Sequence, residues 1–322
     1  MRAFVTGANG FVGSAVVRAL LAKGHAVVAL VRDRSDDRNL RGLDVERVTG
    51  DLERVEALIG YLAGCDALFH VAALYSPRPE DAERMRLVNV ECSRRLLMMA
   101  ADLGVARIVH TSTIGTIGRR DDGGPPTEVD TMAVTPRTSA YARSKLQGER
   151  AALELAAEGA PIVVVNPCAP VGRGDYRPTS TGQRIVDYLG GRTPKLSPGG
   201  INFCSVEDIA VGHLLAAEKG CAGERYILGN AEGNLDLKQF MVLMQQVSGI
   251  RPPDSGVGAR AKRLARRVVG RGGRTAPSQA GGTRPDALTA DPSRAIRELG
   301  LPQTPLEVAF AEAVAWFRDQ EA

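Results

Sequence analysis

The chain of 322 residues carries 41 Lys plus Arg against 37 Asp plus Glu, a formal net charge of only +4, and 44% of its residues are hydrophobic. This composition excludes an intrinsically disordered chain, and so small a net charge argues against nucleic acid as a partner. The five cysteines are widely spaced without a C-x-x-C pair, which excludes a disulfide framework and a metal site. With no signal peptide or spanning segment in view, we expect a cytoplasmic protein.

Short apolar runs alternate with longer helical patterns through the first half of the chain. The apolar runs predict strands at residues 2–6, 26–31, 45–49, 67–71, 107–112 and 161–166. Apolar side chains at helical spacing predict helices at residues 11–23, 80–103 and 140–158. Strands joined by crossover helices indicate a doubly wound parallel sheet, so the predicted fold is α/β of the Rossmann type.

Beyond Pro167 the helical pattern dominates and strands become sparse. It predicts helices at residues 180–190, 206–219, 235–248, 292–299 and 305–318. We therefore expect residues 1–170 to form the Rossmann domain. Residues 171–322 are expected to form a smaller, mostly helical substrate-binding domain, and segments of the two can interleave.

A glycine loop, residues 6–13 (TGANGFVG), follows the first predicted strand and opens the first predicted helix. Backbone N–H groups at such a turn approach a pyrophosphate at the helix N-terminus, and glycine is needed because a Cβ would block that approach. The G-x-x-G-x-x-G spacing at this place predicts a site for a nicotinamide dinucleotide.

The end of the second strand distinguishes the two nicotinamide cofactors. A carboxylate there accepts hydrogen bonds from the ribose 2′-hydroxyl of NAD, whereas an arginine pairs with the 2′-phosphate of NADP. Arg32 comes first and Asp33 second. We therefore expect NADP(H), with Arg32 binding the phosphate. NAD bound through Asp33, with Arg32 and Arg34 in solvent, is the alternative.

Tyr141 and Lys145 lie four residues apart within the predicted helix 140–158, so they share one face. An ammonium held there stabilises the phenolate and can bond the nicotinamide ribose, which makes the tyrosine a usable proton donor and acceptor. A Y-x-x-x-K match is common by chance, but its place after the fifth strand of a glycine-loop domain indicates a catalytic pair.

Several motifs together resemble the extended short-chain dehydrogenase/reductase family, also called NAD-dependent epimerase/dehydratases. They are the glycine loop, Gly50-Asp51-Leu52, His70-Val71-Ala72-Ala73, Asn89, Thr111-Ser112-Thr113, Tyr141 with Lys145, and Asn166-Pro167. The likeness covers nearly the whole chain outside residues 255–285. Within the family, the chain looks similar to dihydroflavonol-reductase-like proteins and, among these, to the hopanoid-associated sugar epimerase group. Residues 177–182 (RPTSTG), 212–216 (GHLLA) and 223–229 (GERYILG) carry that finer likeness.

The resemblance implies a set of residues that contact the cofactor. These are Gly7, Gly10, Phe11, Val12, Gly13, Arg32, Asp51, Leu52, Val71, Ala72, Ala73, Asn89, Thr111, Tyr141, Lys145 and Pro167. It also implies that hydride passes between nicotinamide C4 and a carbonyl or carbinol carbon while Tyr141 transfers the proton. Lys145 then fixes the ribose and lowers the tyrosine pKa.

The resemblance assigns the orientation of the substrate oxygen to Thr113. Ser112 competes for that role, but it stands one position off the family register and neighbouring strand residues face opposite sides. Tyr75, Cys168 and Cys204 are candidates for substrate contact, with packing as the alternative for each. His70 and His110 are expected to be packed histidines.

Three functions remain open at this point. A ketone or aldehyde reductase is favoured, because the stretch 200–208 (GINFCSVED) lacks the arginine and the histidine that help nucleotide-sugar epimerases hold a diphosphate. A sugar or nucleotide-sugar epimerase or dehydratase is the alternative, and a cofactor-binding scaffold without turnover is the third. With only 4% aromatic residues, the expected small-molecule substrate is aliphatic, isoprenoid or sugar-like. The sequence leaves the oligomeric state open, with a homodimer as one option because relatives often pair through the helix that carries the Tyr and Lys.

Residues 251–285 concentrate positive charge. They hold nine basic residues and one acidic residue, Asp254. A helix over Ala259–Val269 would place Leu264 and Val268 on one face among arginines, a pattern typical of peripheral contact with an anionic membrane. If the substrate is a membrane lipid such as an isoprenoid, residues 259–274 are the candidate for that contact; a solvated loop or a lid over the pocket is an equal alternative.

Overall fold

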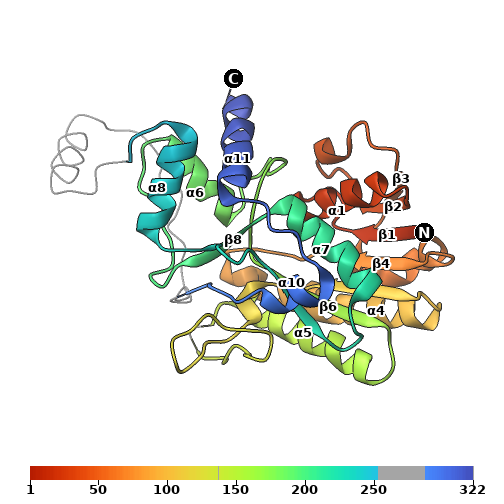
Figure 1. The fold of residues 1–322 in the computed structure, drawn as a ribbon. Coiled ribbons are helices and arrows are strands. Elements are labelled where there is room, and N and C mark those ends of the chain that lie inside the picture. The colour runs from red at the N-terminus through yellow and green to blue at the C-terminus, as the bar shows by residue number, and fades with distance from the viewer. Residues whose placement is uncertain (137, 253–286, 322) are drawn as a thin grey trace.

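The computed structural model describes residues 1–136, 138–252 and 287–321 (Figure 1). Seven strands form one parallel sheet in the order β3-β2-β1-β4-β5-β6-β9. The strands are β1 (Arg2–Thr6), β2 (Ala26–Val31), β3 (Glu46–Thr49), β4 (Ala67–His70), β5 (Arg107–Thr111), β6 (Ile162–Pro167) and β9 (Arg225–Leu228). The order reverses between β1 and β4, so the predicted α/β doubly wound fold is confirmed.

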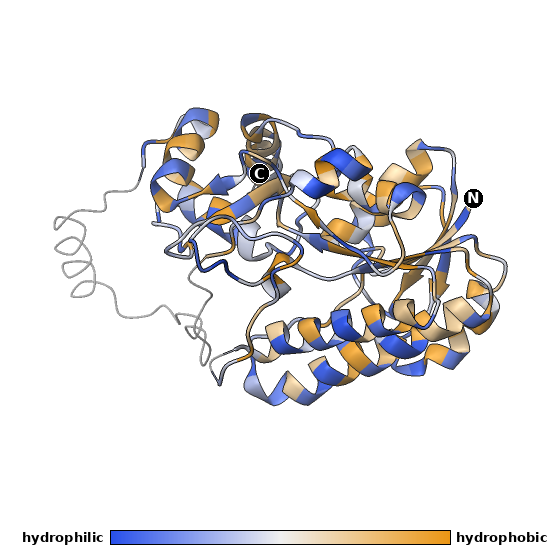
Figure 2. Cartoon of the chain, turned by 60° about the horizontal axis from the view of Figure 1, so that its bottom comes forward, coloured by the Kyte–Doolittle hydropathy of each residue, from blue (hydrophilic) through white to orange (hydrophobic). Residues whose placement is uncertain are grey.

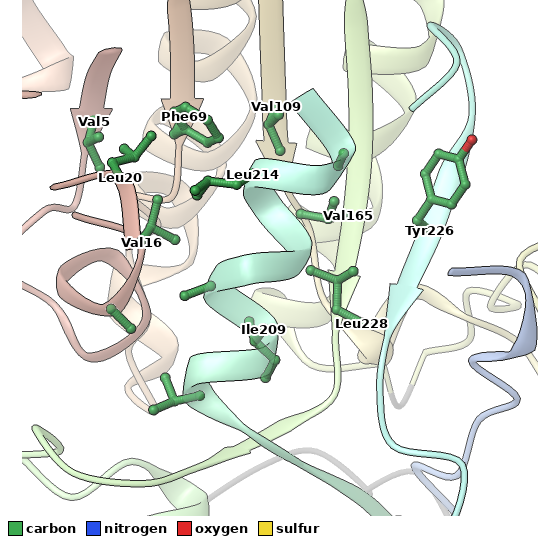
Figure 3. Packing of buried hydrophobic residues seen from close by; sticks show 14 of the residues in the cluster. Val5, Val16, Leu20, Phe69, Val109, Val165, Ile209, Leu214, Tyr226 and Leu228 are labelled. Atoms are coloured by element: carbon green, nitrogen blue, oxygen red, sulfur yellow. The ribbon is translucent and has the colours of Figure 1, made fainter. Parts of the chain in front are cut away.

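Helices cover both faces of this sheet, because its strands send alternate side chains to opposite sides. On β1, Val5 joins the core under α1 (Phe11–Ala22) and α7 (Val206–Lys219). Its neighbour Phe4 joins the core under α4 (Ser93–Asp102) and α5 (Ala140–Ala157). Figure 3 shows the first core, with α7 lying across the strands. The covering helices carry both hydrophilic and hydrophobic residues (Figure 2), as two-layer packing requires.

A second, three-stranded sheet follows, in the order β10-β8-β7. Its strands are β7 (Ala169–Val171), β8 (Ile201–Ser205) and β10 (Asn234–Leu235). These strands and β9 were not predicted, although helices predominate among the described residues of the second half, as expected. The physical reason is that each is a run of two to five residues, too short for periodicity to separate a buried strand from a loop or helix.

The second half of the chain therefore contributes to both sheets. Strand β9 forms the edge of the large sheet and α7 packs on its face, whereas the small sheet shares a core with α6, α8 and α11. The remaining long helices are α6 (Ser180–Leu189), α8 (Leu237–Ser248), α10 (Ser293–Leu299) and α11 (Leu306–Glu321). Their bounds agree closely with the predicted ones.

The predicted continuous helix 80–103 is broken into several turns. The segment contains η3 (Pro79–Asp81), α3 (Ala82–Arg86), the π-helical turn η4 (Leu87–Cys92) and then α4. A π-turn inserts one residue into the helical ladder, and such turns often occur at functional sites. The other short turns are η1 (Arg38–Leu40), η2 (Leu52–Leu58), α2 (Ile59–Leu62) and η5 (Ile114–Thr116).

The basic segment and its expected membrane contact at 259–274 fall among residues 253–286, outside the described residues. Elsewhere, no helix that the structure describes is both long and apolar enough to cross a bilayer.

Candidate active site

The glycine loop between β1 and α1 allows close approach of the backbone. Gly7 has a φ of +68°, and a Cβ there would lie 2.8 Å from the backbone nitrogen of Ala72. A Cβ on Gly13 would collide with the Gly7 carbonyl oxygen. Helix α1 begins after Gly10 without a side-chain cap and without an acidic residue in its first turn, so its N-terminus is suited to an anion.

A cavity of about 370 Å³, which we call the inner cavity, opens above this loop. Eleven of the predicted cofactor residues line it: Gly7, Gly10, Phe11, Val12, Gly13, Arg32, Asp51, Leu52, Val71, Ala72 and Ala73. These residues come from the ends of four neighbouring strands at the carboxyl edge of the sheet, where ligands bind in open α/β sheets.

A larger cavity of about 1020 Å³, the outer cavity, adjoins the inner one and shares Arg32, Gly50 and Asp51 with it. Its walls are the segment 32–36 after β2 and the turn 174–177 after β7. The inner and outer cavities together provide the space for a dinucleotide that runs from the glycine loop past the end of β2.

Helix α5 carries Tyr141 and Lys145. It begins at its N-cap Ser139, whose hydroxyl accepts a hydrogen bond from the Ala142 N–H. The buried Lys145 ammonium donates to the Thr111 carbonyl oxygen at 2.8 Å, and burial lowers the pKa of Lys145 to about 8, although the charge of Glu149 opposes the shift.

Tyr141 lies under the exposed ring of Tyr75, with the two ring centroids 5.0 Å apart and the planes near perpendicular. Burial, and secondarily Tyr75, raise the pKa of Tyr141 to about 12. This direction is opposite to the expected lowering by Lys145, because the loss of hydration on burial dominates the pKa of the phenol.

The structure distinguishes Thr113 from Ser112. Thr113 is half-buried, and its hydroxyl accepts a hydrogen bond from the Gly115 N–H, which leaves its own proton to donate. Ser112 is buried at 5% exposure and faces the Thr116 hydroxyl. Of these two hydroxyls at the end of β5, that of Thr113 is therefore the more accessible, and its role toward a substrate oxygen stays a prediction.

A buried polar network behind Thr113 was missed by sequence reasoning. The Glu149 carboxylate accepts hydrogen bonds from the Thr116 hydroxyl and the Asn166 amide, both at 2.7 Å, and pairs with Arg225 at 2.8 Å. The Asn166 amide and the Thr116 hydroxyl also reach the Thr113 carbonyl oxygen. Arg225 donates further to the Glu128 carbonyl oxygen.

The network joins the end of β5 to α5. It thus fixes Thr113 relative to Tyr141 and Lys145. The signal that could have found it is spacing, because Glu149 stands one further helical turn beyond Lys145.

Asn89, on the π-helical turn, uses its side chain for hydrogen bonds within the protein. Its oxygen accepts from the Leu74 N–H at 2.7 Å, and its NH₂ donates to the Leu74 carbonyl and the Ser144 hydroxyl. A Cβ on Gly148 would collide with the Asn89 carbonyl oxygen. The side chain therefore holds α5 and the loop after β4 together, and its implied contact with a cofactor stays a prediction.

Neither described cavity is lined by Tyr75, Thr113, Tyr141 or Lys145, and four other predicted residues also lie apart from both. The Thr111 hydroxyl bonds to His213 Nε2 at 3.0 Å, so Thr111 serves the site through the carbonyl that holds Lys145. Pro167 is buried at the end of β6. Cys168 and Cys204 are 2% and 0% exposed within the core, where burial raises both pKa values, so they act as apolar fillers and not as substrate contacts.

The histidines at the strand ends are packed, as expected. His70 bonds to the hydroxyls of Thr6 and Ser93, both at 2.8 Å, and the His110 ring lies 5.4 Å from it. Burial, assisted by the charge of Lys145, lowers the pKa of both rings. Both are therefore neutral at physiological pH.

Comparison with known proteins gives concordant matches. The model of the NAD dependent epimerase/dehydratase family matches residues 3–229. A Synechocystis sp. protein named "Putative dihydroflavonol 4-reductase" is 37% identical over 98% of this chain and 94% of its own length. Sterol demethylase protein B of Methylococcus capsulatus is 36% identical over 99% of both chains.

Two further relatives extend the comparison. A 4-hydroxy-2-methyl-3-oxo-4-farnesyl-3,4-dihydroquinoline-1-oxide ketoreductase of Stigmatella aurantiaca is 34% identical over 82% of this chain and 78% of its own. The crystal structure of gox2253 superposes with a TM-score of 0.81 at 35% identity, covering 99% of this chain and 98% of that one.

Proposed function

Because this chain belongs to the NAD dependent epimerase/dehydratase family of extended short-chain dehydrogenases/reductases, we propose that it is an NADP(H)-dependent reductase of a ketone or aldehyde. The observation that carries the proposal is the arrangement at the carboxyl edge of the sheet. There the Lys145 ammonium bonds to the Thr111 carbonyl oxygen at the end of β5, and the half-buried Thr113 follows two residues later. Tyr141 stands one helical turn before Lys145, and β5 ends at the same edge of the sheet as the strand that leads into the glycine loop.

The residues at this edge fit a nicotinamide dinucleotide. The glycine loop leaves space that a Cβ would fill, and the N-terminus of α1 suits the pyrophosphate. NADPH, when bound, supplies the hydride. Thr113 donates a hydrogen bond to the carbonyl oxygen of the substrate and orients it. Burial keeps Tyr141 in its phenol form, with a pKa of about 12, which is the form that gives a proton to the developing alkoxide.

The preference for NADP over NAD is supported by the pairing of charges after β2. Asp33 lies 3.6 Å from Arg34, whereas Arg32 borders both cavities and has no ion pair with any other described residue. A free guanidinium is suited to a 2′-phosphate.

Reduction is favoured over epimerisation by how β8 is used. Within the stretch 200–208, which lacks the arginine expected of an epimerase, Asn202 is fully buried and bonded to the Asn230 carbonyl oxygen and the Asn234 side chain. The Ser205 hydroxyl caps α7. Both positions serve the fold, so neither is free to hold a sugar diphosphate.

For the substrate we propose an isoprenoid-like carbonyl compound. The printed names of two relatives refer to a sterol and to a farnesyl-substituted quinoline, and the low aromatic content of this chain offers few stacking surfaces for a planar polyphenol. Within the family we place the chain nearest the hopanoid-associated sugar epimerase group, on the motif over residues 177–182.

The test is a substrate panel. Purified protein is mixed with NADPH or NADH and with farnesyl and steroid ketones, and nicotinamide absorbance at 340 nm is followed. We expect oxidation of NADPH with at least one ketone and none with Tyr141→Phe. Interconversion of UDP-glucose and UDP-galactose without net cofactor consumption would refute the reductase and establish the epimerase. Cofactor binding with no turnover on any substrate would instead support a scaffold.

A further inference from the structure

The outer cavity has two arginine-bearing walls that are far apart in sequence. Arg32 stands at the end of β2, and Arg177 stands on the turn 174–179 after β7. Both side chains are exposed, and neither forms an ion pair with another residue in the described part of the chain.

None of the acidic residues that line this cavity forms an ion pair with Arg32 or Arg177. Asp51 accepts a hydrogen bond from the Glu53 N–H at the start of η2. Asp33 pairs with Arg34, and Glu53 pairs with Arg84 at 2.8 Å. Asp36 accepts two-pronged hydrogen bonds from Arg38, at 3.0 and 2.6 Å, and these bonds hold the pKa of Asp36 at about 2. The charge of Arg177 contributes to that lowering, which places it near the segment after β2.

The turn that carries Arg177 is braced from several sides. The Asp175 carboxylate accepts hydrogen bonds from the N–H and the hydroxyl of Thr179, at 2.8 to 3.0 Å. The Asn39 amide donates to the Gly174 carbonyl oxygen at 3.0 Å, which ties the turn to the loop after β2.

Tyr176 adds a further brace beside Arg177. Its ring lies between the Arg38 guanidinium, 4.2 Å from the ring centroid, and the edge of Trp316, with 4.7 Å between centroids. Because this backbone is already fixed, binding of a ligand by Arg177 loses little additional conformational entropy of the turn.

We propose that Arg177 is a second phosphate ligand, which together with Arg32 binds the phosphate on the adenosine ribose of NADP(H). A guanidinium can give a phosphate two parallel hydrogen bonds, and two such groups from separate segments would select the phosphorylated ribose more strongly than Arg32 alone. This inference rests on the NADP(H) preference of the proposed function. It makes the second half of the chain part of the cofactor specificity.

The test measures binding and not turnover. Dissociation constants for NADPH, NADH, 2′,5′-adenosine bisphosphate and 5′-AMP are determined by calorimetry for wild type, Arg177→Ser, Arg177→Lys and Arg32→Ser. Arg173→Ser is the matched control: it removes the same charge from the same loop, but Arg173 pairs with Glu207 and does not line the cavity. Thermal melting without ligand checks that each variant folds.

We expect Arg177→Ser to weaken the binding of NADPH and of the bisphosphate by about 10- to 100-fold, as for loss of a charged hydrogen bond. The dissociation constants of NADH and 5′-AMP should be unchanged. Arg177→Lys should retain part of the preference, and Arg173→Ser all of it. Equal weakening of phosphorylated and unphosphorylated ligands, or no effect, would overturn the role of Arg177. If only Arg32→Ser abolishes the preference for NADPH, the proposed role of Arg177 is wrong and the assignment of NADP(H) as the cofactor stands. If wild type shows no preference, both are wrong.

Discussion

Replacing Glu149 by Gln removes the one charge at the centre of the network behind Thr113 and keeps the size of the side chain. Glu149 is 1% exposed and the Arg225 side chain 11%, so the substitution leaves a nearly buried guanidinium without its carboxylate. Breaking a buried ion pair by removing one partner typically lowers the free energy of unfolding by about 3 to 5 kcal/mol. We take the lower end, about 3 kcal/mol, because Arg225 retains its bond to the Glu128 carbonyl oxygen.

Urea unfolding at pH 7 measures that loss, with Glu154→Gln as the matched control. Glu154 lies on the same helix but is exposed, so its substitution should change the free energy of unfolding by no more than about 0.5 kcal/mol. Domains of ordinary stability, about 5 to 15 kcal/mol, survive a loss of 3 kcal/mol, so the variant remains folded for kinetic assays.

The catalytic consequences separate positioning from mere stability. Glu149 lines neither cavity, so the affinity for NADPH should be unchanged, whereas kcat falls because Thr113 is no longer fixed relative to Tyr141. The charge of Glu149 raises the pKa of Lys145, so the limb of the pH profile that reports Lys145 should move to lower pH. An unfolding free energy within about 1 kcal/mol of wild type, with kcat and pH profile unaltered, would refute the positioning role.

Three substitutions test the site itself. Tyr141→Phe should lower kcat by about 100- to 10,000-fold with little change in the dissociation constant for NADPH, since the lost group is the proton donor; near-normal kcat would disprove the role. Thr113→Val should lower kcat/KM by about 10-fold, for one lost hydrogen bond, and Ser112→Ala should have a much smaller effect; the reverse order would assign the substrate oxygen to Ser112. Lys145 has a folded pKa of about 8, below its ordinary value of 10.5, so wild-type stability should rise as pH increases from about 8 to 10.5, where the unfolded chain binds more protons than the folded one. Lys145→Met should abolish that rise. The free energy of unfolding is measured by urea titration at pH 8 and pH 10, and an equal change between the two pH values in both proteins would contradict the assignment.

Features encoded by short-range spacing were predictable from the sequence. A few neighbouring residues are enough to assign these features to their elements. They are the glycine loop, the pair Tyr141 and Lys145, and six strands of the large sheet. Strand β9 and the small sheet were not predictable, because their runs of two to five residues become strands only through pairing with distant segments.

Contacts between distant segments also limit how much of the candidate site the sequence predicts. Asn39 and Gly174 are 135 positions apart, and Glu149 and Arg225 are 76 apart. No periodicity connects such pairs, and only the folded sheet brings them together. Cys168 illustrates the converse error, since its place next to Pro167 indicates a pocket wall until burial shows that it belongs to the core.

Helix α5 explains why the catalytic geometry depends on these distant contacts. Tyr141, Lys145 and Glu149 follow one another at four-residue intervals along it, so they lie on one face. Lys145 bonds to a carbonyl of β5, and Glu149 bonds to Thr116 beyond its end, two polar connections one helical turn apart. Apolar packing alone tolerates small slips of a helix over a sheet, but two buried hydrogen-bonded charges do not, because a shift of either would leave it unpaired. The position of the Tyr141 phenol relative to Thr113 is therefore determined by Lys145 and Glu149, which connect the same helix to the end of β5.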